Sequence, residues 1–109
     1  MTNEVLAKTE WRSYFKRYDE ILAGTEVRIE VASPALGDQV LVERAALLGL
    51  TYEAREDVLS IVASNHSHIV KQPREISVHE VDGRLQAMRI LDQEGRQQIL
   101  TFFERHGRS

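Results

Sequence analysis

Several features that mark particular protein classes are missing from this chain. None of its 109 residues is cysteine, which excludes a disulfide scaffold and thiolate chemistry. The longest apolar run, residues 45–50, is far shorter than the ~20 residues that span a bilayer. Residues 1–8 lack the basic start and apolar stretch of a signal peptide. We therefore expect a cytoplasmic protein with no membrane association.

A strong excess of one charge is also missing. The net charge is -3 and the pI about 5.8, which argues against a dedicated nucleic-acid binder. The clearest basic group, Arg12, Lys16 and Arg17, lies near tyrosines in a way that nucleic acid could use. Asp19 and Glu20 interrupt it, so a solvated helix face is the simpler interpretation, and we expect no nucleic-acid partner.

Catalytic and cofactor motifs are not found either. No serine has the context of a nucleophile elbow, and no glycine-rich loop is available to hold a phosphate. The carboxylate pairs at residues 19–20 and 56–57 are sequence neighbours, which cannot share one face of a helix or strand. We therefore expect no enzyme activity, no catalytic residue and no cofactor.

Two histidines are the leading candidate metal ligands. His66 and His68 are two residues apart in a predicted loop, and His79 or Glu53 could complete a ligand set. A metal site usually needs three or four converging ligands, and this chain has no cysteine and no i, i+4 histidine pair. We therefore expect a solvated loop and no metal. His79 could instead lie in a shallow polar pocket beside Gln86 and Arg89.

The first predicted element is an amphipathic helix. Thr9 is a suitable N-cap and Gly24 a suitable stop signal. Between them, apolar residues recur at helical spacing and charged residues fill the opposite face. The apolar stripe comprises Trp11, Tyr14, Phe15, Tyr18, Ile21 and Leu22. Residues 1–8 are predicted to be a flexible lead-in to this helix.

The middle of the chain predicts strands. Residues 26–32 alternate as a half-buried strand does, and residues 57–63 form another strand. Residues 39–53 indicate either two strands or one strand bent at Gly49, while a short helix over residues 43–48 is the competing interpretation. Residues 64–72 are predicted to be a loop or one helical turn.

The last third predicts a three-stranded antiparallel meander. Its turns, residues 81–84 and 93–96, each place an acidic residue before a glycine that can adopt positive φ. If each turn is a three-residue loop with a G1 bulge, Glu80 pairs with Arg84 and Asp92 with Arg96. Ile76 then faces Met88.

This register sorts the meander into two faces. The core face collects Ile76, Val78, Met88, Ile90, Leu100 and Phe102. The opposite face carries polar residues together with Leu85, Leu91, Ile99 and Phe103. Such surplus apolar residues commonly mark an interface, so these four are our candidate interface residues. The rival explanation is that residues 40–50 cover them within the same chain.

Together these elements predict an α+β fold. A helix and five to seven strands with short connections form one domain over residues 9–105, followed by a frayed tail at residues 106–109. The sheet is strongly curved, and the helix covers its open side. Closure into a small SH3-like or Sm-like barrel is the alternative.

The order of these features resembles a small bacterial family catalogued only as a domain of unknown function. The resemblance covers most of the chain. It rests on the helix with Trp11 and Tyr18, on Gly37-Asp38-Gln39, Asn65-His66-Ser67-His68-Ile69 and Pro73, on the acidic-Gly-Arg turns, and on Leu100-Thr101-Phe102-Phe103. It implies a compact α+β domain and carries no activity and no functional residue.

The sequence therefore favours a non-catalytic binding module that associates with another protein or with itself as a homodimer. One alternative is a small β-barrel that binds nucleic acid, which would need a concentrated basic stripe. The other is a domain with a small-ligand pocket between helix and sheet, which would need polar groups around an apolar cavity.

Overall fold

The structure, a computed structural model, describes residues 2–22 and 24–103. It confirms an α+β fold with a short helix and one antiparallel sheet, and that sheet has eight strands where five to seven were predicted. The helical elements are the 3-10 helix η1 (Lys8–Glu10) and α1 (Trp11–Ile21). The strands are β1 (Thr2–Leu6), β2 (Glu26–Ser33), β3 (Gly37–Glu53), β4 (Val58–Ala63), β5 (His66–Lys71), β6 (Pro73–Val81), β7 (Arg84–Asp92) and β8 (Gln97–Phe103).

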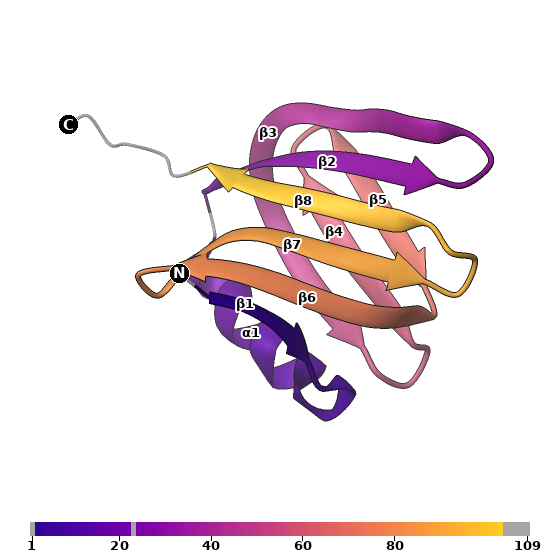
Figure 1. The fold of residues 1–109 in the computed structure, drawn as a ribbon. Helices are drawn as coiled ribbons and strands as arrows, with labels where there is room; N and C mark the ends of the chain where they lie inside the picture. The colour runs from indigo at the N-terminus through magenta and orange to yellow at the C-terminus, as the bar shows by residue number, and fades with distance from the viewer. Residues whose placement is uncertain (1, 23, 104–109) are drawn as a thin grey trace.

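The long strand β3 folds this sheet into two layers. The strand order is β1-β6-β7-β8-β2-β3-β4-β5, and β3 pairs with β2 through its first half and with β4 through its second half. The front layer contains β1, β6, β7, β8, β2 and the first half of β3 (Figure 1). The back layer contains the second half of β3, β4 and β5. The sheet does not close into a barrel, because β1 and β5 remain at its two ends.

Residues 39–53 are therefore one bent strand, and the competing short helix over residues 43–48 is wrong. Pairing with β2 ends at Ala46, and pairing with β4 starts at Leu47. The register shifts between Leu47 and Gly49, which identifies a bulge where the strand leaves one layer and enters the other. Helix formers in this segment adopt the extended conformation because each half of the strand has a partner.

Helix α1 takes the place of a neighbouring strand beside the second half of β3. The Leu50 N–H donates to a carboxylate oxygen of Asp19 at 2.8 Å, and the Leu47 N–H donates to the Thr25 carbonyl at 2.7 Å. The helix buries Trp11, Tyr14, Phe15 and Tyr18, as its apolar stripe predicts, whereas Ile21 is exposed. The helix thus protects a strand edge that would otherwise offer unpaired backbone groups.

Two segments predicted to lack regular structure are strands. Residues 2–6, within the predicted flexible lead-in, form β1, which pairs with β6 and buries Leu6. Residues 66–71, predicted to be a loop or helical turn, form β5, which pairs with β4. β1 is stabilised by β6, which is distant in sequence, and β5 by its hairpin neighbour β4. Because the pairing determines the structure, the local composition of these segments does not predict a strand. The frayed tail predicted at residues 106–109 lies outside the described residues.

The meander is present, but its first turn differs from the prediction. Val81 pairs with Arg84 across a two-residue loop in which Asp82 and Gly83 both have positive φ, 53° and 76°. A register shift between His79 and Glu80 follows at once, so Ile76 faces Ile90 and not Met88. The predicted pairing of Glu80 with Arg84 is also wrong.

The predicted core face is nevertheless correct. The turn and the bulge together shift the register from the predicted one by two residues, and an even shift leaves each side chain beyond the bulge on its predicted face. All six members of the core face are buried, and Met88 faces Leu100 as predicted. The second turn is the predicted three-residue loop. The Asp92 backbone N–H donates to the Arg96 carbonyl, and the Arg96 N–H donates to a carboxylate oxygen of Asp92. Gly95 has a φ of 84°.

Candidate binding surface on the front layer

The outward surface of the front layer, which we call the front face, lies toward the viewer in Figure 1. No element within residues 2–22 and 24–103 covers it. Cross-strand pairing assembles it in rows, because residues directly opposite each other point to the same side of a sheet. The central row runs across six strands: Val5, Ser77, Arg89, Ile99, Glu30 and Val40.

Two further rows flank the central row. One contains Asn3, His79, Ala87, Thr101 and Arg28, and the other contains Glu75, Leu91, Gln97, Ala32 and Asp38. Three of the four candidate interface residues, Leu91, Ile99 and Phe103, point outward here and are half-buried by their neighbours. The Arg44 guanidinium covers the ring of Phe103 at 4.3 Å.

Leu85 requires a correction, because it does not belong to the front face. Its side chain is only 5% exposed and lies in the core, where it lines a pocket with Tyr18 and Phe102. Glu80 pairs with Leu85 and His79 with Ala87, so Gln86 is the extra residue of a bulge. The bulge turns Leu85 inward while Ala87 and Arg89 face outward.

A hollow of about 340 Å³ interrupts the front face at Ala87, whose small side chain lies between larger neighbours. The polar side chains around it are Asn3, Ser77, His79 and Arg89, and Ile99 adds an apolar wall. His79 Nδ1 lies 2.6 Å from Asn3 Oδ1. The shallow pocket suggested for His79 is thus present with Arg89 on its wall, but the other suggested neighbour, Gln86, does not line it. No carboxylate of the described residues lines it either.

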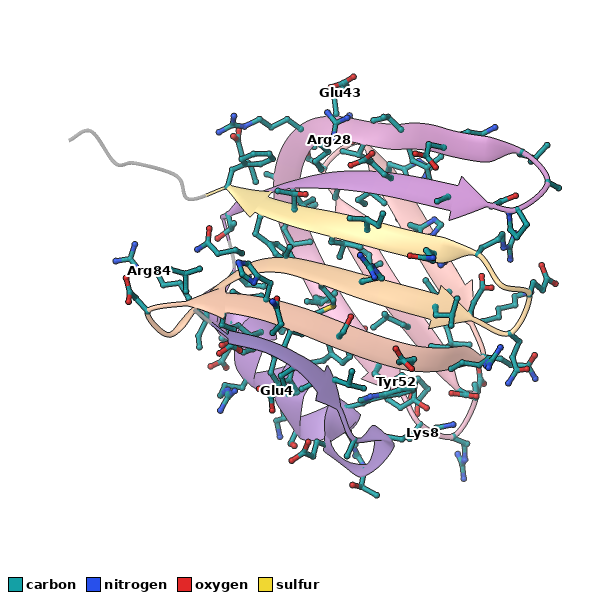
Figure 2. All side chains as sticks on the ribbon, in the orientation of Figure 1. Glu4, Lys8, Arg28, Glu43, Tyr52 and Arg84 are labelled. Atoms are coloured by element: carbon teal, nitrogen blue, oxygen red, sulfur yellow. The ribbon has the colours of Figure 1, made fainter. Side chains whose placement is uncertain are left out.

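Charges on the front face are distributed unevenly. Arg28 contacts Glu43 at 3.0 Å and Glu30 at 3.4 Å, and Figure 2 shows Arg28 and Glu43 together at the upper margin of the sheet. Arg89, in contrast, is exposed and has no hydrogen bond or ion pair with any described residue. Among the described residues, one cation without an ion-pair partner therefore lies beside the hollow, and the Glu30 carboxylate, which shares Arg28 with Glu43, lies two strands away.

The histidine pair predicted as a weak metal candidate lies elsewhere, on β5 in the back layer. The rings of His66 and His68 stack with centroids 6.3 Å apart, and His68 Nε2 lies 3.4 Å from Gln98 Oε1 of β8. Burial lowers the pKa of His68. Within the described residues, no group of three or more His, Cys, Asp or Glu side chains is arranged to hold a metal ion.

A polar cluster that the sequence did not indicate joins α1 to β6. Tyr14 and Tyr18 both donate hydrogen bonds to one carboxylate oxygen of Glu80, at 2.7 and 3.1 Å. Burial, together with these hydrogen bonds, raises the pKa of both tyrosines, so they remain neutral donors. Arg17 lies over both rings, which places one member of the basic helix group inside this cluster.

A pocket of about 420 Å³ lies between the end of α1 and the β6–β7 turn. Apolar side chains of Ile21, Leu22 and Phe102 line it, with Thr25 and Gln86 as polar neighbours. Arg84, which Figure 2 shows at the tip of the turn, also lines it. This is the position that a small ligand between helix and sheet would occupy.

Comparison with known proteins gives a family and no activity. Residues 2–108 match a family described as a family of unknown function, DUF5335. An uncharacterized protein of Aquifex aeolicus is 38% identical over 101 residues, which cover 92% of this chain and 91% of that protein. No solved structure matches. No helix in the described part of the chain is long and apolar enough to cross a membrane.

Proposed function

The chain belongs to the DUF5335 family of unknown function, and we propose that it acts as a non-catalytic module that binds protein through its front face. The partner that the geometry favours is a second copy of the chain. The observation that carries this proposal is a broad sheet face that no described element covers and that exposes apolar side chains at both ends of its central row.

The size of the front face supports a protein partner. Six strands about 4.8 Å apart, each about 20 Å long, give a flat area of about 600 Å². A standard interface buries about 800 Å² on each partner, which this face and its margins could supply. The outer surface of the back layer has three strands and a flat area of about 300 Å², so it is too small to hold a stable dimer alone.

The composition of the front face also suits an interface. Val5 is 62% exposed and Val40 is 42% exposed, while Leu91 and Ile99 lie half-buried between them. Contact with a second sheet would remove this apolar area from water. Ile99 lies in the central row with two strands of the face on one side and three on the other, so it is the best single position to test.

The test replaces Ile99 with aspartate and measures solution mass by light scattering. Ile99→Asp should give a folded monomer, because the charge enters the contact without entering the core. Thr51→Asp is the matched control, since Thr51 is exposed on the outer surface of the back layer and should leave the mass unchanged. A monomeric wild-type protein at high micromolar concentration would contradict the proposal.

A small anion is a second candidate partner. The hollow at Ala87 offers the unpaired Arg89 guanidinium, the Ser77 hydroxyl and the His79 imidazole, and it is lined by no carboxylate. These groups suit a phosphate or carboxylate. Inorganic phosphate should then shift the NMR signals of His79 at millimolar concentration in the wild type and not in Arg89→Met. The absence of any shift would exclude this candidate.

Nucleic acid has less support as a partner, because the net charge is -3 and four basic side chains already contact carboxylates. Arg44 pairs with Glu26, Lys8 with Asp57, and Arg96 with both Asp92 and Glu94. Arg28 is shared between two glutamates. Binding a phosphate backbone would require these pairs to be exchanged, which lowers the electrostatic gain.

A further inference from the structure

We infer that two copies pack front face to front face about a two-fold axis that runs along β8, so that Arg89 of each copy contacts the partner's Glu30. This inference rests on the proposed function and adds the orientation of the two subunits. It follows from the order of residues in the central row, where Ile99 on β8 lies between Arg89 on β7 and Glu30 on β2.

The central row is complementary to itself about Ile99. Arg89 and Glu30 lie one strand away on opposite sides, about 4.8 Å from Ile99 in each direction. Ser77 and Val40 lie one strand farther out. A rotation that exchanges the two sides of β8 therefore brings a guanidinium opposite a carboxylate twice, with Ile99 against the partner's Ile99 on the axis.

The other simple two-fold axis has the wrong electrostatics. An axis that runs along the central row, perpendicular to the strands, would place each strand opposite the same strand of the partner. Arg89 would then face the partner's Arg89, and Glu30 the partner's Glu30. Like charges facing each other in a closing interface are unfavourable, so the axis along β8 is favoured at the centre of the face, where Arg89 and Glu30 lie. That axis also places Glu75 opposite the partner's Asp38, but these two carboxylates lie two strands from β8, toward the margins of the contact.

The shape of the front face agrees with this axis. The same rotation places Ala87, the floor of the hollow, opposite the partner's Arg28, because both lie one strand from Thr101 in the neighbouring row. The hollow of about 340 Å³ then gives room for the long side chains of the partner's Arg28 and Glu30. Glu30, which contacts Arg28 at 3.4 Å within its own subunit, gains Arg89 as a second cation.

The geometry of packed sheets makes these central contacts the decisive ones. Two sheets that pack face to face are usually rotated by about 30° relative to each other because each is twisted. Residues near the axis therefore stay in register, while residues at the margins separate. Ile99, Arg89 and Glu30 lie at or next to the axis, so charge reversal at these positions should have a larger effect than at the margins.

The test is a set of charge reversals, with the dimer dissociation constant measured by sedimentation. Arg89→Glu sets two glutamates against each other, and Glu30→Arg sets two arginines against each other, so each should weaken the dimer at least tenfold. The double variant restores both attractive pairs and should recover most of the affinity. Melting curves would check that each variant is folded.

A mixture gives a further prediction and a control. An equimolar mixture of the two single variants should form a heterodimer, because every Arg89–Glu30 contact becomes an attractive pair again. Glu53→Arg, an exposed reversal on the back layer, should have no effect on the mass.

If Ile99→Asp is monomeric but Arg89→Glu still dimerises like the wild type, the front face is the interface and the axis inferred here is wrong. If the wild type is monomeric, the proposed function fails and the inferred axis fails with it.

Discussion

The two layers of this molecule each leave one sheet surface open, and they differ in size and in charge. The outer surface of the back layer has a centre of small uncharged residues, with Thr51, Ser60 and Ile69 in one row. Its exposed apolar residues are Leu48, at 64%, and Ile69, at 48%. The front face is about twice as broad and has charged residues within its central row.

This difference shows that exposed apolar residues alone do not identify an interface. Exposure alone does not separate the two surfaces, because Leu48 and Ile69 on the back layer are about as exposed as Val5 and Val40 on the front face. The outer surface of the back layer gives a partner little area, and its charged residues Glu53 and Lys71 lie at one end, outside its central row. The front face has a larger area, and its central row has the charge pattern from which we infer one arrangement of the proposed dimer.

The largest expected effect is a difference in unfolding free energy between a substitution in the core and one on the front face. Leu85→Asp should cost more than ~3 kcal/mol of unfolding free energy, because it places a charge in the core and removes apolar packing. Ile99→Asp, on the same meander but facing outward, should cost about 1 kcal/mol or less in the monomer. Chemical denaturation of both variants gives the comparison. Equal losses would mean that Ile99 belongs to a core and not to a surface.

A moderate effect is expected where α1 protects the back layer. Asp19→Ala removes the acceptor for the Leu50 N–H and should cost ~1–3 kcal/mol, because that N–H would remain partly buried without a partner. Asp19→Asn is the matched control, since it keeps an oxygen acceptor and should lose less. Denaturation midpoints measure both. An unchanged midpoint in Asp19→Ala would show that the helix is not needed at this strand edge.

The smallest expected effect is a pH dependence where the two layers meet at His68 and Gln98. Burial lowers the pKa of His68 in the folded state, so the unfolded chain binds a proton more readily. The stability that depends on neutral His68 is therefore fully present above the ordinary histidine pKa of about 6.5 and decreases as pH falls below it. His68→Gln should flatten the slope of melting temperature against pH in this range, whereas His66→Gln should change it less. Parallel slopes in all three proteins would contradict this account.

The parts of the fold that the sequence predicts are those specified by local pattern. The helix follows from its apolar stripe, and the six core residues of the meander follow from alternation, which tolerates a register error of two residues. Local pattern does not predict β1 and β5, because these segments are held as strands by pairing with β6 and β4. The inward turn of Leu85 was missed because no residue type marks the bulge at Gln86.

The candidate interface was predicted only in part for the same reason. Leu91, Ile99 and Phe103 lie on the meander and share its alternation. Val5, Glu30 and Val40 complete the central row from strands that are far away in sequence. Their alignment depends on β8 pairing with β2 and β6 pairing with β1, which local composition does not encode.

The most direct test of the central claim is the mass of the wild-type protein in solution, measured by sedimentation equilibrium from low to high micromolar concentration. If the front face binds a second copy, the mass should rise with concentration toward twice the 12.5 kDa of one chain and reach a plateau there. The plateau is expected because a two-fold interface uses the same surface on both partners and leaves none for a third. A constant mass of 12.5 kDa over the whole range would contradict the account.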